Sequence, residues 1–96
     1  TSFMRIIGNI EHPNLKITVF KMDNKLSIKF ESGLYEQTYK FRVQEGLENF
    51  KDTQRLVDED FINKALDDIQ TMHKTRNEAL SRFLRPIGAN EFEEII

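Results

Sequence analysis

The strongest constraint on the fold is a change in hydrophobic period near residue 44. Before it, apolar and polar side chains alternate, as in residues 25–30, where Leu26, Ile28 and Phe30 are separated by polar residues. A period of two is typical of strands that bury one face of a sheet. After it, apolar residues recur at spacings of three and four, the period of a helix. The change predicts a sheet followed by a helix.

Turn signals divide the first half of the chain into four strands. Asp23 and Asn24 suit a two-residue hairpin loop, because both residue types tolerate positive φ. Ser32-Gly33 predicts the next turn, and the segment EHPN at 11–14 reads as a loop because proline cannot donate to a ladder. The pattern predicts an antiparallel meander with strands near residues 3–10, 15–22, 25–31 and 34–43.

These turns also predict the register of the meander. Each hairpin fixes which residues face each other, and apolar residues then gather on one face of the sheet. Opposite charges face each other on the other face, which supports the register. The predicted cross-strand pairs are Val19–Ile28, Ile17–Phe30, Thr18–Lys29, Lys16–Glu31, Phe30–Tyr35, Lys29–Glu36, Lys25–Lys40, Ile10–Leu15 and Arg5–Phe20.

The second half of the chain predicts one long helix over residues 58–85. Asp58 is a suitable N-cap, and Pro86 with Gly88 ends the helical pattern. Residues 44–57 are a connector with room for a helical turn, and residues 86–96 form an acidic tail with apolar anchors. With 96 residues the chain is expected to form a single domain, 1–96. The fold class is α+β, a ββββα arrangement with the helix on the apolar face.

The expected lengths of these elements do not match. About 26 helical residues span roughly 39 Å, whereas strands of about eight residues span only ~26 Å. The helix therefore overhangs the sheet, yet its apolar stripe continues to Phe83 and Leu84. A second copy of the chain, packed helix to helix about a two-fold axis, is the simplest cover. The alternative is that residues 44–57 or the tail fold back over the overhang.

Composition excludes several classes of chemistry. The chain has no cysteine, which excludes disulfides and thiol catalysis and favours a cytoplasmic location. No apolar run reaches the ~18–20 residues that span a bilayer, and the first ten residues do not resemble a secretory signal. His12 and His73 have no metal-ligand spacing around them, and the four glycines form no phosphate-binding loop. We therefore expect a non-enzymatic protein with no metal and no cofactor.

The charges are unevenly distributed along the chain. Residues 1–43 hold seven basic and four acidic residues, a balance of +3, and residues 44–96 hold seven basic and twelve acidic residues, a balance of −5. The predicted register puts most of the basic side chains of the first half on the outer sheet face, together with Phe20. Cations that neutralise phosphates and an aromatic ring that stacks on a base are what binders of single-stranded nucleic acids use. The candidate nucleic-acid-binding residues are Arg5, Phe20, Lys25, Lys29, Lys40 and Arg42.

Three other interpretations stay open. Lysines also protect exposed sheets from aggregation, and for the outer face as a whole this pattern favours a solvated surface. A protein-interaction module would act through the helix and the acidic tail. A small-ligand or enzymatic site between sheet and helix would be lined by Tyr35, Gln37, Tyr39 and His73.

The order of elements resembles that of the Whirly and Pur-alpha families of single-stranded DNA and RNA binders. The resemblance covers residues 3–85 in element order only, four antiparallel strands followed by a helix. It implies a dimer joined through the helix, with a β-surface that binds single-stranded DNA or RNA. No binding residue is carried over from those families, because no sequence motif of theirs is matched. The chain also looks like small bacterial proteins of unassigned role.

Overall fold

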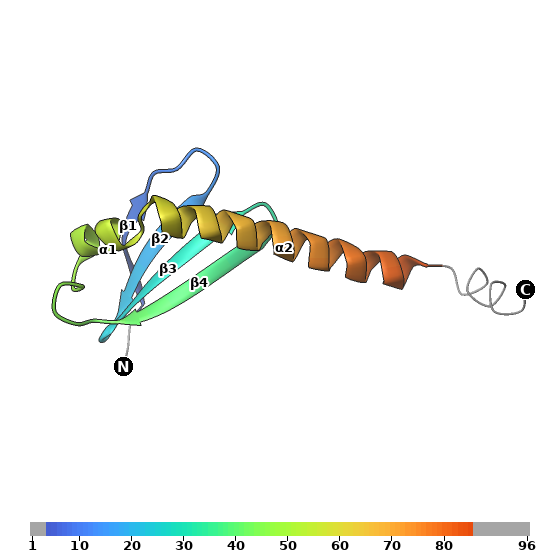
Figure 1. Cartoon of the computed structure of the whole chain (residues 1–96). Coiled ribbons are helices and arrows are strands. Elements are labelled where there is room, and N and C mark those ends of the chain that lie inside the picture. Colours follow the sequence, from blue (N-terminus) through green and yellow to red (C-terminus); the bar gives the residue numbers. More distant parts are fainter. Residues whose placement is uncertain (1–3, 86–96) are drawn as a thin grey trace, which may run out of the picture.

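The computed structural model describes residues 4–85 and contains a four-stranded antiparallel sheet followed by a long helix (Figure 1). The strands lie side by side in sequence order, so the predicted ββββα meander is confirmed. The predicted tail at 86–96 and Phe3 of the first predicted strand lie outside the described residues. The elements are β1 (Arg5–Ile10), β2 (Lys16–Met22), β3 (Lys25–Ser32), β4 (Tyr35–Arg42), α1 (Phe50–Leu56) and α2 (Glu59–Leu84).

The hairpin of β2 and β3 has the predicted register. Val19 lies opposite Ile28, and Thr18 lies opposite Lys29. Asp23 in the turn has a φ of 55°, in the left-handed region that aspartate tolerates better than most residues. The predicted inward set of β3 is confirmed as fully buried: Leu26, Ile28 and Phe30.

The hairpin of β3 and β4 has a register that differs from the predicted one by two residues. Ser32 pairs with Tyr35, so the turn is Gly33-Leu34 rather than Ser32-Gly33. Gly33 has a φ of 58°, and a two-residue turn with positive φ at its first position favours glycine there. A shift of two residues leaves every side chain on its predicted face. The observed pairs, which replace the predicted ones, are Lys25–Arg42, Leu26–Phe41, Ser27–Lys40, Ile28–Tyr39, Lys29–Thr38, Phe30–Gln37 and Glu31–Glu36.

The pairing of β1 with β2 also differs from the predicted one. Ile10 lies opposite Ile17 rather than Leu15, and the register shifts between Ile6 and Gly8. This bulge inserts one extra residue, which reverses the faces of the residues before it. Arg5 consequently lies opposite Lys21. The prediction that Arg5 lies over Phe20 on the outer face is therefore wrong.

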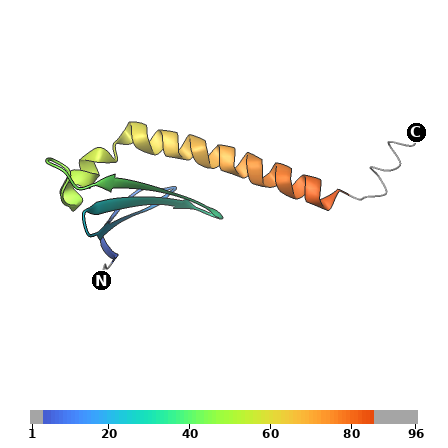
Figure 2. The ribbon, with the colours of Figure 1, turned by 90° about the horizontal axis from the view of Figure 1, so that it is seen from below.

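The core lies between the sheet and the two helices, which both cover the same face (Figure 2). Phe30 is completely buried, and its ring centre lies 5.1 Å from that of Phe61 and 5.9 Å from that of Tyr39. Such tilted and edge-on contacts are the favourable arrangements of aromatic pairs. The buried apolar residues of this cluster are Leu15, Ile17, Ile28, Phe30, Val57 and Ala65.

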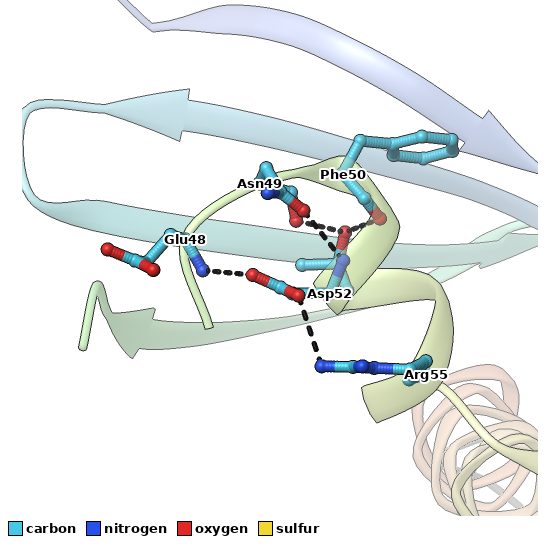
Figure 3. Close-up of polar contacts among 6 residues, drawn as sticks. Glu48, Asn49, Phe50, Asp52 and Arg55 are labelled. Atoms are coloured by element: carbon cyan, nitrogen blue, oxygen red, sulfur yellow. Dashed lines mark hydrogen bonds and ion pairs between the residues drawn. The ribbon is translucent and has the colours of Figure 1, made fainter. Parts of the chain in front are cut away.

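The connector contains a short helix, α1, whose start is capped by its own side chains (Figure 3). Asn49 Oδ1 accepts a hydrogen bond from the Asp52 backbone N–H at 2.9 Å, and Asp52 Oδ2 accepts one from the Glu48 N–H at 2.8 Å. The Phe50 ring lies against Gly8 of β1. This segment therefore packs on β1. The alternative that residues 44–57 fold back over the overhanging part of α2 is wrong.

The long helix α2 begins at a cap that the sequence predicts and extends past the sheet (Figure 1). Asp58 Oδ1 accepts a hydrogen bond from the Phe61 N–H at 2.9 Å. Beyond the sheet, Phe83 is 83% exposed and Leu84 is 64% exposed. The predicted overhang with an uncovered apolar stripe is thus confirmed. Within residues 4–85, no helix has both the length and the apolar character that crossing a membrane needs.

Candidate nucleic-acid interface

The outer face of the sheet, the face away from the helices, is organised in cross-strand rows. The row next to the Asp23 turn contains Met22, Lys25 and Arg42. The next row contains Ile6, Phe20, Ser27 and Lys40. We call these two rows together the basic end of the outer face, because they hold three cations and no carboxylate.

The cations of the basic end are exposed and lie close together. Lys25 pairs directly with Arg42, and Lys40 lies in the adjacent row. Like charges directly across a strand pair destabilise the sheet, so this pair has no structural benefit. Within residues 4–85, Lys25, Lys40 and Arg42 form no ion pair, although the nearby turn carries Asp23. An anion at this end would relieve the repulsion.

Lys29 belongs to the opposite, mixed end of the face. Its Nζ lies 3.5 Å from Glu31 Oε1 and 4.0 Å from Glu36 Oε2. The same Nζ lies 5.4 Å from the centre of the Phe20 ring, a cation–π contact. Lys29 is therefore already neutralised by two carboxylates, of which the sequence predicted only Glu36 as its partner, and it covers one side of the aromatic ring.

The structure keeps five of the six candidate residues on the outer face and removes Arg5 from it. It brings Phe20, Lys25, Lys40 and Arg42 together, connects Lys29 to them through the Phe20 ring, and places Arg5 elsewhere. It also adds Ile6, which is 60% exposed and lies opposite Phe20. Sequence reasoning missed Ile6 because the bulge reverses its face. Gly8 was the available signal, since a glycine inside a strand often marks a bulge.

The space between β4 and α2 is the site of the small-ligand interpretation, and its part around Gln37 and Tyr39 is occupied by internal hydrogen bonds. Gln37 Nε2 donates to the Ala65 carbonyl at 2.7 Å, and Tyr39 Oη donates to Gln37 Oε1 at 2.6 Å. Burial, aided by the nearby Asp68 carboxylate, raises the pKa of Tyr39 above its ordinary value of 10.0. The polar atoms of Gln37 thus satisfy partners within the fold, as buried amides usually do.

The two histidines each make hydrogen-bonding contacts within the protein. His12 Nδ1 accepts a hydrogen bond from the Asn14 backbone N–H at 3.1 Å, within the loop between β1 and β2. His73 on α2 lies 2.7 Å from Tyr35 Oη and 3.0 Å from Asn77 Nδ2. In the described part of the chain, no cluster of three or more His, Asp or Glu side chains has a geometry that would hold a metal ion.

Comparison with known proteins adds no functional information. No protein-family model matches the chain, and neither the curated proteins nor the solved structures contain a match. The functional argument consequently depends on the geometry of the outer face and of α2.

Proposed function

We propose that the protein is a non-enzymatic homodimer, joined through α2, that binds single-stranded nucleic acid at the basic end of its outer sheet face. The observation that carries this proposal is that Lys25, Lys40 and Arg42 lie in the same two cross-strand rows as Phe20. Three strands contribute to this group, so the sheet holds it as one unit. The order of elements, four strands and then a long helix, resembles that of the Whirly and Pur-alpha binders and supports the same proposal.

In the proposed mechanism the cations neutralise phosphates and the aromatic ring stacks on a base. Lys25, Lys40 and Arg42 displace counterions from the backbone, so three contacts give a slope of about −2 in a plot of log affinity against log salt. Stacking on Phe20 requires Lys29 to leave the ring, which costs roughly 0.5–1 kcal/mol at an exposed site. A stacked base contributes roughly 1–3 kcal/mol, so stacking prevails.

The test is fluorescence anisotropy with a labelled single-stranded oligonucleotide at low salt. A variant with alanine at Lys25, Lys40 and Arg42 is expected to lose most of the affinity. The control variant carries alanine at Lys51, Lys64 and Lys74, which changes the net charge equally on another surface. A signal that is absent at tens of micromolar protein, or that both triple variants reduce equally, would refute the proposal.

Phe20→Ala separates stacking from electrostatics. We expect this variant to lose roughly 1–3 kcal/mol of binding free energy while keeping the salt slope of the wild type. An unchanged affinity would exclude a role for the ring, even where the lysines bind phosphate.

A second candidate function is that of a protein-interaction module. The observation that favours it is the exposure of Leu80, Phe83 and Leu84 at the end of α2. In that case the helix is the functional surface and the sheet face is only solvated. A pull-down in nuclease-treated lysate that returns one stoichiometric protein partner, which the Phe83→Asp variant does not return, would support this function over the first.

A further inference from the structure

The long helix α2 carries an apolar seam with the spacing of a coiled coil, which runs from the sheet into the part of the helix that extends past it. Its first three members, Ile62, Ala65 and Ile69, pack on the core. The seam continues in the same direction after the sheet ends, because residues three and four apart share one helix face. Its members at alternating spacings of three and four are Ile62, Ala65, Ile69, Met72, Arg76, Ala79 and Phe83.

A hollow lies beside this seam, where α2 leaves the sheet. It has a volume of about 430 Å³ and is mostly apolar. Leu34 at the tip of the β3–β4 turn is one of its walls and is 77% exposed. The residues that line the hollow are Leu34, Tyr35, Thr71, Met72, Thr75 and Arg76.

We propose that two copies of the chain pack their α2 helices antiparallel, so that Phe83 of each copy inserts into the hollow of the other. The two-fold axis passes between Asn77 and Glu78. A residue that precedes the axis in one copy then faces the residue that follows the axis by the same number of positions in the other copy. This inference deepens the homodimer of the proposed function, on which it rests, by specifying direction, register and contact residues.

The register is chosen so that the α2 residues that line the hollow of one copy face the apolar residues at the exposed end of α2 in the other copy. The axis places Met72 opposite Phe83 and Arg76 opposite Ala79 of the second copy. The same axis places Thr75 opposite Leu80 and Thr71 opposite Leu84. The four helical residues that line the hollow therefore meet the four apolar residues of the exposed end.

The sizes and chemistry of these side chains suit the arrangement. Ala79 is small where the helices cross, which allows close approach, and the aliphatic stem of Arg76 can cover it while the guanidinium reaches solvent. A single polar residue in a seam also specifies the direction and register of helix pairing. A stripe that is complementary to itself closes on a second copy, so that the stripe is covered in both copies.

The area of the exposed patch agrees with a stable dimer. On a scale of about 150–250 Å² for a buried aromatic side chain, Phe83 and the exposed leucines offer on the order of 500 Å² of apolar surface per copy. A standard interface buries roughly 800 Å² per partner. Met72, Ala79 and the stems of the flanking polar residues are placed to supply the difference.

The first experiment measures mass by sedimentation equilibrium over a range of concentrations. The full chain is expected to be a dimer at tens of micromolar. Phe83→Asp should raise the dissociation constant at least about 100-fold, because it replaces the aromatic ring by a hydrated carboxylate in a mostly apolar hollow. Since Phe83 is 83% exposed in the single chain, this variant keeps its fold, which circular dichroism checks. Asn63→Asp adds the same charge to an exposed position of α2 and should leave the dimer unchanged.

The second experiment measures direction and register by thiol cross-linking. The chain has no cysteine, so introduced thiols are the only ones present. A mixture of Arg76→Cys chains and Ala79→Cys chains, one of them tagged, should give a cross-linked heterodimer several-fold in excess over either homodimer, because a disulfide requires Cα atoms about 5.5–6 Å apart.

Each contrary result has a distinct meaning. Predominant cross-linking of Arg76→Cys with itself would show parallel helices and overturn the register. A chain that is monomeric at all concentrations would overturn the dimer. If it became dimeric only after truncation at Arg85, residues 86–96 would be the occupant of the hollow instead. None of these results alters the nucleic-acid test, because the basic end lies on the other side of the sheet.

Discussion

Gly8 offers a sharp test of how the short helix α1 is held against the sheet. A Cβ built on Gly8 would touch the Phe50 ring at Cε1 and lie 2.6 Å from both Cδ1 and Cζ. Carbon atoms in contact prefer separations of about 3.5–4.0 Å, so the ring must move by about 1 Å to admit one methyl group. The change Gly8→Ala thus acts on one contact, between β1 and α1.

The magnitude follows from two opposed effects. Overpacking a tight contact costs typically 1–3 kcal/mol. Alanine in a strand gains roughly 0.5–1 kcal/mol over glycine from the lower entropy of its unfolded chain. We therefore expect a net loss of about 1–2 kcal/mol, which corresponds to a fall in Tm of about 4–8 °C for each kcal/mol in a domain of this size.

The assay is urea unfolding of four chains: wild type, Gly8→Ala, Phe50→Leu and the double variant. The smaller leucine leaves room for the methyl group, so Gly8→Ala should cost at least about 1 kcal/mol less in that background. Asn9→Ala, at the adjacent exposed strand position, controls for a general effect of alanine in β1. A neutral Gly8→Ala, or an equal cost in both backgrounds, would show that the contact does not hold α1 in place.

Two further predictions concern α2 and its contact with the sheet. Asp58→Ala removes the N-cap bond to the Phe61 N–H and should cost about 0.5–2 kcal/mol in urea unfolding, whereas Asp58→Asn should cost much less. The raised pKa of Tyr39 means that the folded state holds the phenolic proton more tightly than the unfolded state, in which the pKa is about 10. This stabilisation is complete below pH 10 and is lost as the pH rises through the folded pKa. Alkaline unfolding should therefore show a smaller loss of stability in Tyr39→Phe than in the wild type, and parallel curves would contradict the assignment.

The faces of β2, β3 and β4 follow from the sequence because alternation within an unbroken strand is a local property. Leu26, Ile28 and Phe30 lie on one side whatever their partners are, since successive side chains point to opposite faces. The cap of the long helix at Asp58 is local in the same sense. The overhang follows from element lengths alone.

The cross-strand partners were less predictable than the faces. Turns at Ser32-Gly33 and at Gly33-Leu34 both keep the apolar residues inside, so the hydrophobic pattern does not distinguish them. Lys25 and Lys40 were consequently paired in error, although both remain on the basic end with Arg42. A like-charge pair near the Asp23 turn survives the correction because Arg42 replaces Lys40 as the partner.

The sequence by itself determined the order of elements, the faces of β2, β3 and β4 and the length of α2, because each depends on residues that are neighbours along the chain. The tertiary structure alone decided that a bulge moves Arg5 off the outer face and brings Ile6 beside Phe20. It also decided that α1 packs on Gly8 and that a hollow forms beside Leu34. These features arise from contacts between segments that are distant in the sequence, and the hydrophobic periodicity of neighbouring residues does not depend on those contacts.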